Sequence, residues 1–167
     1  DRIQSVITHM EKGEIELALS DVCIALDITA QKYYNETKSS AKVYKRFLAE
    51  HMDVILATTN PSIVSKSIKL PFTHPDIYSD KDGYSTLEQI IYHVVRCGLV
   101  HGTGESNKII WNNQIMLFVS QEGELYLPPT LIWGLAICVI ACPVNSDQHV
   151  MDTAWVSAAS FKYLIND

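Results

Sequence analysis

Two residues near the middle of the chain, Arg96 and His101, combine the side chains needed to cleave RNA without a metal ion. Arginine is permanently charged and presents two parallel donors that match the oxygens of a phosphate. Histidine takes up and releases protons near neutral pH, so it can help to deprotonate a ribose 2′-hydroxyl. The arginine then stabilises the charge that grows on the phosphate. The pair is therefore a candidate catalytic site.

The spacing of these two residues requires a helix end between them. On an ideal α-helix, five residues turn through about 500°, which leaves Arg96 and His101 about 140° apart. Gly98 and Gly102 are stop signals, and a helix that ends at Gly98 lets His101 swing back beside the last turn. In the competing structural interpretation, His101 caps the carbonyls of a helix C-terminus and Arg96 is a solvated surface residue.

Other polar residues are candidates to support the same site. Asp27 interrupts the apolar run "CIALDITA", and Ser20 lies seven residues earlier on nearly the same helix face. The functional interpretation is a carboxylate that orients His101 or a group of the substrate. The alternative is a solvated stripe on an amphipathic helix. Thr103 follows the motif and is a candidate to line the cleft.

A zinc site is the rival use of this region. His93, Cys97 and His101 are spaced by four residues, and neighbouring members are able to share a metal ion on one helix face. One ion normally spans a single pair at this spacing, however, and Gly98 interrupts the second pair. No nearby cysteine–histidine pair supplies the remaining ligands. We therefore expect no metal ion and no other cofactor.

The hydrophobic periodicity predicts that amphipathic helices fill the first hundred residues. The strongest pattern runs from Glu14 to about Asn35. A later helix begins at "STLE", where Ser85 caps the first turn and Glu88 reaches back to the backbone. The expected helices cover residues 2–11, 14–35, 41–58 with a bend near His51, a short one at 62–69, and one from 85 to the stop at Gly98.

After about residue 106 the period changes, which favours a small antiparallel sheet followed by a helix. The expected elements are strands at 109–111, 115–119 and 124–127, turns at 112–113 and 122–123, and a helix from Pro129, in its first turn, to Pro143. The tail at 152–166 fits a helix or a strand. The sequence thus predicts one mainly α domain over residues 1–167, with a helical core at about 1–105 and the sheet, buried helix and tail at about 106–167.

Charge and cysteine usage restrict the function classes. With 47% hydrophobic and 19% charged residues, the chain is expected to be globular. The formal net charge of −6 excludes a general basic footprint for nucleic acid, although a local cleft in an acidic protein can still bind RNA. None of the four cysteines forms a CxxC pair, so free thiols in the reducing cytoplasm are expected.

The most apolar segment, "TLIWGLAICVIAC" at Thr130–Cys142, predicts a buried helix. Its 13 residues are too few for the ~20 that a bilayer requires, so no membrane contact is expected. The segment is apolar on nearly all sides, which requires burial in more than one direction. That burial is provided either within the domain or across a dimer.

The motif and its helical setting resemble the HEPN superfamily (higher eukaryotes and prokaryotes nucleotide-binding). The matching motif is R-x4-H, formed by Arg96 and His101 in "RCGLVHG" at the end of a late helix. The segment "GEIELALSDVCIALDITAQKYY" is similar to the long helix of that family. The resemblance covers roughly residues 1–105, and the hairpin and later helix are an elaboration of the HEPN-like helical bundle.

This resemblance implies a homodimer in which two copies of the motif face one cleft. Many family members are metal-independent endoribonucleases of toxin–antitoxin, abortive-infection and other antiviral defence systems, whereas others are non-catalytic binding or dimerisation modules. In a catalytic member, Arg96 would hold the phosphate and His101 would act as general acid or base. RNA is then the substrate, and an antitoxin or another defence-system protein is the expected partner.

Cys97 departs from the family pattern, in which the residue after the arginine is usually polar. A thiol is a weak hydrogen-bond partner. Cys97 and the acidic composition therefore favour an alternative, a non-catalytic HEPN-like dimer module that binds a nucleotide, RNA or a protein. In a third interpretation the chain is a structural or regulatory dimer in which Arg96 and His101 only finish a helix.

Overall fold

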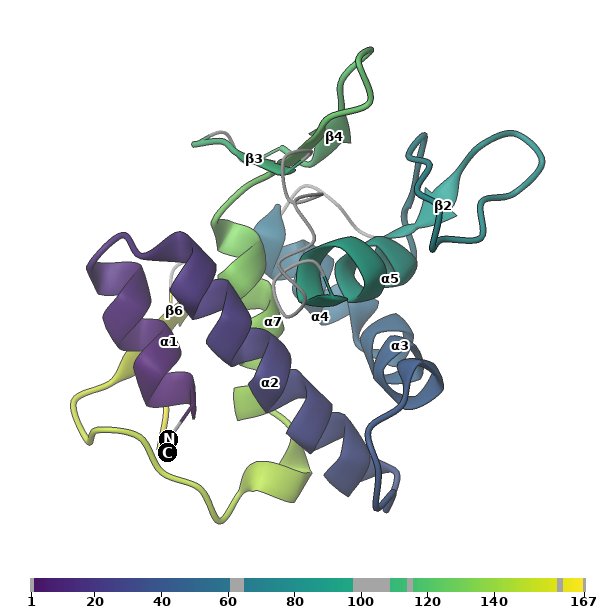
Figure 1. Cartoon of the computed structure of the whole chain (residues 1–167). Coiled ribbons are helices and arrows are strands. Elements are labelled where there is room, and N and C mark those ends of the chain that lie inside the picture. Colours follow the sequence, from purple (N-terminus) through teal and green to yellow (C-terminus); the bar gives the residue numbers. More distant parts are fainter. Residues whose placement is uncertain (1, 61–64, 98–108, 114–115, 159–160, 167) are drawn as a thin grey trace.

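Helices form most of the secondary structure and pack around the long helix α2 (Figure 1). The computed structural model describes residues 2–60, 65–97, 109–113, 116–158 and 161–166. The helices are α1 (Arg2–Glu11), α2 (Ile15–Tyr33), α3 (Ala41–Glu50), α4 (Met52–Thr59), α5 (Leu87–Ile90), the π-helix η1 (Ile91–Arg96), α7 (Thr130–Ile140) and the 3₁₀ helix η3 (Pro143–Asn145). Together with short strands, they confirm the mainly α fold class.

Helix α2 lies between α1 and α3 and also contacts α7 (Figure 1). Gly13 makes the turn from α1 into α2 with a φ of 73°, a left-handed conformation that glycine adopts without strain. Glu16 lies in the first turn, where a negative charge suits the helix dipole. Besides the polar Asp21 and Thr29, α2 buries small or branched apolar side chains: Ala18, Leu19, Val22, Cys23, Ala25, Leu26 and Ala30.

The predicted bend near His51 is confirmed, because His51 separates α3 from α4. Ser40 caps α3, its hydroxyl accepting a hydrogen bond from the Val43 amide at 3.2 Å. The His51 ring stacks on Phe47 with 4.1 Å between ring centroids. Its Nδ1 also lies 2.9 Å from the Phe47 carbonyl oxygen. These contacts hold the two helices at the break.

Helix α7 buries the apolar segment inside the protein, against α4, α2 and α1. Leu131, Ile132 and Leu135 are fully buried. At Gly134 a Cβ atom would lie only 2.7 Å from the Ile55 carbonyl oxygen of α4, so the two helices approach as closely as a glycine permits. No helix among the described residues is long and apolar enough to cross a membrane.

Helix α5 begins one residue later than the sequence predicted. Thr86 and Gln89 form the capping box, in place of Ser85 and Glu88. The reason is that Ser85 is buried, and its hydroxyl donates instead to the Phe72 carbonyl oxygen at 2.6 Å. After α5 the helix widens into η1, whose i→i+5 hydrogen bonds are rare in proteins and are often found at functional sites.

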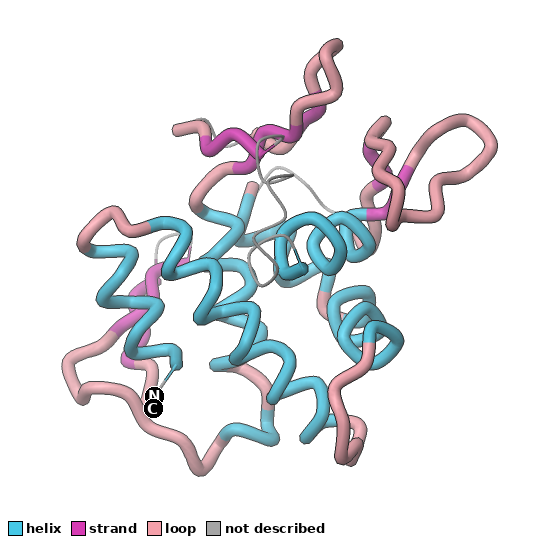
Figure 2. The backbone as a smooth tube through the Cα atoms, in the orientation of Figure 1, coloured by secondary structure: helices cyan, strands magenta, loops and turns pink. Residues whose placement is uncertain are grey.

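The strands form three small sheets (Figure 2). Their bounds are β1 (Lys69–Leu70), β2 (Ser85–Thr86), β3 (Ile109–Trp111), β4 (Phe118–Val119), β5 (Leu125–Leu127), β6 (Trp155–Ala158) and β7 (Phe161–Leu164). Strands β1 and β2 pair antiparallel. Residues 65–70 are therefore not helical, and the predicted short helix at 62–69 is wrong over its second half, while 61–64 lie outside the described residues.

The three-stranded sheet has the order β3-β5-β4 and is mixed, not antiparallel throughout as predicted. Strands β4 and β5 form the expected antiparallel hairpin, whereas β3 pairs parallel with β5. Leu125 and Leu127 are fully buried, so β5 takes the central position over the core and β3 pairs with its free edge. At the C-terminus, β6 and β7 pair antiparallel, which decides the ambiguous tail in favour of strands.

We expect Gly134→Ala to destabilise the protein by about 1–3 kcal/mol, because the added methyl group meets the backbone of α4. Helix propensity alone predicts the opposite, a gain of about 1 kcal/mol. Urea denaturation followed by circular dichroism measures the difference. Ala57→Gly, at an exposed position of α4, reports the propensity effect without this contact. A Gly134→Ala protein as stable as the wild type would contradict the close packing of α4 and α7.

Candidate functional site

Arg96, the last residue of η1, forms an ion pair with Asp27 in the middle of α2. Its Nη2 lies 2.8 Å from Asp27 Oδ2. The two side chains are 22% and 13% exposed, so the pair lies at the edge of the core and water reaches it from one side. A charge-assisted bond of this length is among the stronger hydrogen bonds in proteins. It ties the candidate motif helix to α2.

Ser39 joins this pair from the connection that leads into α3. Its hydroxyl donates to the Asp27 carboxylate, with distances of 2.8 and 2.7 Å to the two oxygens. The same hydroxyl oxygen accepts from Arg96 Nη2 at 3.4 Å. Three segments that are distant in sequence therefore meet at one polar cluster, formed by Asp27, Ser39 and Arg96. We refer to these three residues as the Arg96 cluster.

Two tyrosine rings form the apolar side of the Arg96 cluster. The guanidinium carbon of Arg96 is 5.5 Å from the ring centroid of Tyr44 and 5.2 Å from that of Tyr92. At these distances the ring quadrupole attracts the positive charge. Tyr44 is only 1% exposed, and burial raises the pKa of its hydroxyl, with a further contribution from the neighbouring Cys23 thiol. The rings hold the guanidinium in position without neutralising it.

A second cation lies beside Tyr92. Lys45 Nζ is 5.7 Å from the centroid of the Tyr92 ring and 3.5 Å from His93 Nε2. Burial lowers the pKa of His93, and the positive charge of Lys45 lowers it further. His93 is therefore neutral at pH 7 and accepts a hydrogen bond from Lys45. Two cationic side chains, Lys45 and the Asp27-paired Arg96, therefore lie beside the Tyr92 ring.

The remaining predicted site residues are only partly placed. His101 and Thr103 lie outside the described residues, so the Arg96–His101 geometry stays a prediction. Cys97 follows η1 and is half-buried. Ser20 lies on α2 about two turns before Asp27. The hydrogen bonds of the Arg96 cluster among the described residues join Asp27, Ser39 and Arg96 and do not include Ser20.

The zinc hypothesis gains no support from the residues that can be examined. Among the described residues, no three histidine, cysteine or acidic side chains come close enough to hold a metal ion. His93 has the cationic Lys45 as its neighbour, which disfavours a metal ion at Nε2. The third member of that hypothesis, His101, lies outside the described residues.

Sequence reasoning named Asp27 as a candidate supporting residue, and the structure places its carboxylate on Arg96. The predicted role, orienting His101 or a substrate group, stays a prediction, because His101 lies outside the described residues. Sequence reasoning missed Ser39 and Tyr44, because nothing in their sequence neighbourhood links them to residue 96. Tyr92 had a signal, since it precedes Arg96 by four residues, a spacing that brings side chains together on a helix.

The arrangement leaves part of the guanidinium free to bind an anion. The bonds to Asp27 and Ser39 both leave from Nη2. Among the described residues, these two bonds do not use Nε or Nη1, and the Cys97 thiol is a further hydrogen-bond partner of the guanidinium. The donors that these partners leave suit a phosphate. Asp27 therefore has two opposite effects: it fixes the arginine in place, and it lowers the positive potential that a phosphate would meet.

Comparison with known proteins places the whole chain in one family. Residues 1–167 match the Rv1289 family, and the chain belongs to that family. No curated protein and no solved structure matches it. The family's name carries no reaction, ligand or partner, and the resemblance to the HEPN superfamily stays a prediction.

We expect Asp27→Asn to lower the free energy of unfolding by about 2 kcal/mol, because it leaves the charged Arg96 unpaired in a site that is only 22% exposed. Thermal and urea denaturation measure the change. Glu50→Gln is the matched control, since it removes the same charge from the exposed Arg46–Glu50 pair and should have a much smaller effect. Equal effects of the two substitutions would mean that the Arg96 cluster does not stabilise the fold.

Cysteine reactivity tests the burial around Tyr44. Burial raises the pKa of the Cys23 thiol to about 12, so almost no thiolate forms at about pH 8. We expect iodoacetamide to label the half-buried Cys97 in the folded protein and to spare Cys23, as read by mass spectrometry of peptides. In guanidinium chloride both residues should react, which provides the control. Rapid labelling of Cys23 in the folded protein would be inconsistent with the packing of α2 on α3.

Proposed function

We propose that this member of the Rv1289 family is a HEPN-like endoribonuclease that acts as a homodimer and needs no metal ion. The observation that carries the proposal is the way Arg96 is held. It is fixed by Asp27, flanked by two tyrosine rings, still 22% exposed, and five residues before His101 in the sequence. A fixed, partly free guanidinium is what stabilisation of a phosphorane-like transition state requires.

In the proposed reaction, Arg96 binds the scissile phosphate and His101 accepts the proton of the ribose 2′-hydroxyl. The 2′-oxygen then bonds to phosphorus, and the 5′-oxygen of the next nucleotide leaves with a proton from the second motif copy or from water. The products end in a 2′,3′-cyclic phosphate and a 5′-hydroxyl. Asp27 is a positioning residue in this scheme, because it acts on the substrate only through Arg96.

The cellular setting follows from the same resemblance. We expect the protein to act in the cytoplasm, because Cys23, Cys138 and Cys142 are free and buried, which suits a reducing compartment. A toxin–antitoxin or phage-defence system is the expected context, and a partner protein of that system would control the nuclease. RNA enters through a local cationic site, since the chain as a whole is acidic.

A second function is favoured by one specific contact. Asp27 compensates the charge of Arg96, and Cys97 stands where the HEPN pattern usually has a polar residue. A chain with these features fits a non-catalytic HEPN-like dimer module that binds a nucleotide, RNA or a protein. In such a module the Arg96 cluster joins α2 to η1 and orders a binding surface without cleaving the ligand.

The test is RNA cleavage by the purified homodimer in the presence of EDTA. We expect His101→Ala and Arg96→Ala each to lower the cleavage rate by a factor of about 10²–10⁴. Arg46→Ala is the matched control, because Arg46 is an exposed arginine of α3 outside the Arg96 cluster. Product ends are identified by mass spectrometry, and light scattering measures the oligomeric state.

Two outcomes would decide against the nuclease. One is a wild-type dimer that leaves single-stranded and structured RNAs intact even after any co-purifying partner has been removed. The other is cleavage that persists unchanged in His101→Ala. An inert protein whose RNA affinity depends on Arg96 and not on Arg46 would support the binding module instead.

A further inference from the structure

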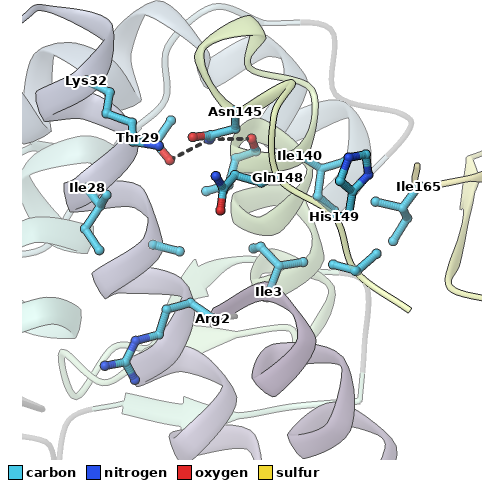
Figure 3. A pocket seen from close by; sticks show the side chains of 13 residues that line it. Arg2, Ile3, Ile28, Thr29, Lys32, Ile140, Asn145, Gln148, His149 and Ile165 are labelled. Atoms are coloured by element: carbon cyan, nitrogen blue, oxygen red, sulfur yellow. Dashed lines mark hydrogen bonds between the residues drawn. The ribbon is translucent and has the colours of Figure 1, made fainter. Parts of the chain in front are cut away.

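A cavity of about 190 Å³ lies beside α2, with Ile28, Thr29 and Lys32 of that helix among its lining residues (Figure 3). It is enclosed by α1, α2, the end of α7 and the segment at 145–150. Ala25 and Thr29 of α2 lie about 160° around the helix axis from Asp27, and Lys32 about 140°. The cavity is therefore separate from the Arg96 cluster and independent of the proposed nuclease site.

The floor of the cavity is apolar. It is formed mainly by branched aliphatic side chains from five parts of the chain: Ile3, Ile28, Val139, Ile140, Val150 and Ile165. Its volume is somewhat larger than the ~150 Å³ of an engineered apolar cavity that binds benzene. A single ring or a branched aliphatic group with a short polar extension therefore fits, whereas a nucleotide does not.

Polar groups are fixed at one side of this apolar space. Asn145 Nδ2 donates to Thr29 Oγ1 at 2.9 Å and to the Val139 carbonyl oxygen at 3.0 Å (Figure 3). Both amide hydrogens of Asn145 are used in this way. Thr29 is only 2% exposed, and its oxygen accepts from Asn145, so its own hydroxyl proton remains available to donate. Ligand pockets usually combine an apolar lining with a few fixed polar groups of this kind.

The ionisable side chains that line the cavity are all basic. Arg2, Lys32 and His149 line it, and none of its described lining residues is an aspartate or a glutamate, although the chain carries a net charge of −6. Arg2 is paired with Asp21 at 2.7 Å, so its charge is already compensated. Lys32 lies one turn beyond Thr29 on the same helix face, which brings an ammonium group and a hydroxyl donor to the same side of the cavity.

We propose that this cavity binds a small monocarboxylate with a compact apolar body, of the aromatic or branched-chain type. The carboxylate is bound by the ammonium group of Lys32 and the hydroxyl of Thr29. The apolar body lies against Ile28, Ile140 and their aliphatic neighbours. None of the ion pairs found among the described residues involves Lys32, so one ammonium group can match the single negative charge of a carboxylate. The buried hydroxyl donor of Thr29 adds the direction that a lysine alone lacks.

Phenylacetate is a suitable probe, with its neutral amide, phenylacetamide, as the matched comparison. Each is titrated into the ¹⁵N-labelled protein and followed by NMR. We expect saturable shifts of the Thr29, Lys32 and Asn145 amides, and tighter binding of the carboxylate than of the amide. Lys32→Met should weaken phenylacetate binding by about tenfold and leave phenylacetamide binding nearly unchanged, since only the carboxylate interacts with the ammonium charge.

Two further variants distinguish binding in this cavity from a nonspecific effect of losing a positive charge on the protein surface. Lys42→Met removes an exposed lysine of α3 and should not change the affinity for either probe. Thr29→Val removes the proposed donor and also the acceptor of Asn145 Nδ2, so thermal denaturation first establishes that the variant is folded. The folded variant should bind phenylacetate more weakly than the wild type does. The proposal is overturned if neither probe gives saturable shifts, if carboxylate and amide bind equally well, or if Lys32→Met and Lys42→Met have the same effect.

Discussion

The close approach of α7 to α4 at Gly134 is the contact on which the arrangement of the other helices depends. Without a side chain at this position, α7 lies against the backbone of α4, and its remaining faces are left to cover α2 and α1. Helix α7 is apolar nearly all round, so it is stable only where several partners surround it. Helix α2 then has one side for α1 and α7 and another for α3 and η1. The candidate site is built on that second side.

The Arg96 cluster joins helices through polar contacts, on the side of α2 that faces α3 and η1. A permanently charged guanidinium at the edge of a core requires a partner, and Asp27 is the carboxylate that α2 presents to it. Ser39 extends the same network to the start of α3, next to the residue that caps that helix. One ion pair therefore stabilises the relative positions of three elements. The same bond limits the charge that Arg96 can offer to a phosphate, so the structural and chemical roles of this residue oppose each other.

Sequence periodicity was sufficient for the helices that have one apolar face or a clear break. Helices α1 and α2 and the break at His51 agree with prediction within one or two residues. The errors lie where tertiary contacts decide between local alternatives. Ser85 has the side chain of a helix cap but is used by the Phe72 carbonyl, and strand β3 pairs with β5 because β5 is the strand that the core buries. For the candidate site, sequence reasoning named Asp27 and Arg96 separately, whereas their pairing depends on a contact across 69 positions that no local pattern encodes.

The π-helical geometry of η1 changes the direction in which the motif arginine is presented. Each hydrogen-bonded ring of a π-helix contains one residue more than that of an α-helix, so successive residues advance around the axis by a smaller angle. From Ile91 to Arg96, the angular difference from an α-helix grows with each residue. A helical wheel drawn for "IIYHVVR" with 3.6 residues per turn therefore assigns Arg96 to the wrong azimuth relative to Leu87. The single widened turn therefore changes the direction in which the Arg96 side chain leaves the helix. Ile91, Val94 and Val95 of the same turn stay packed in the core.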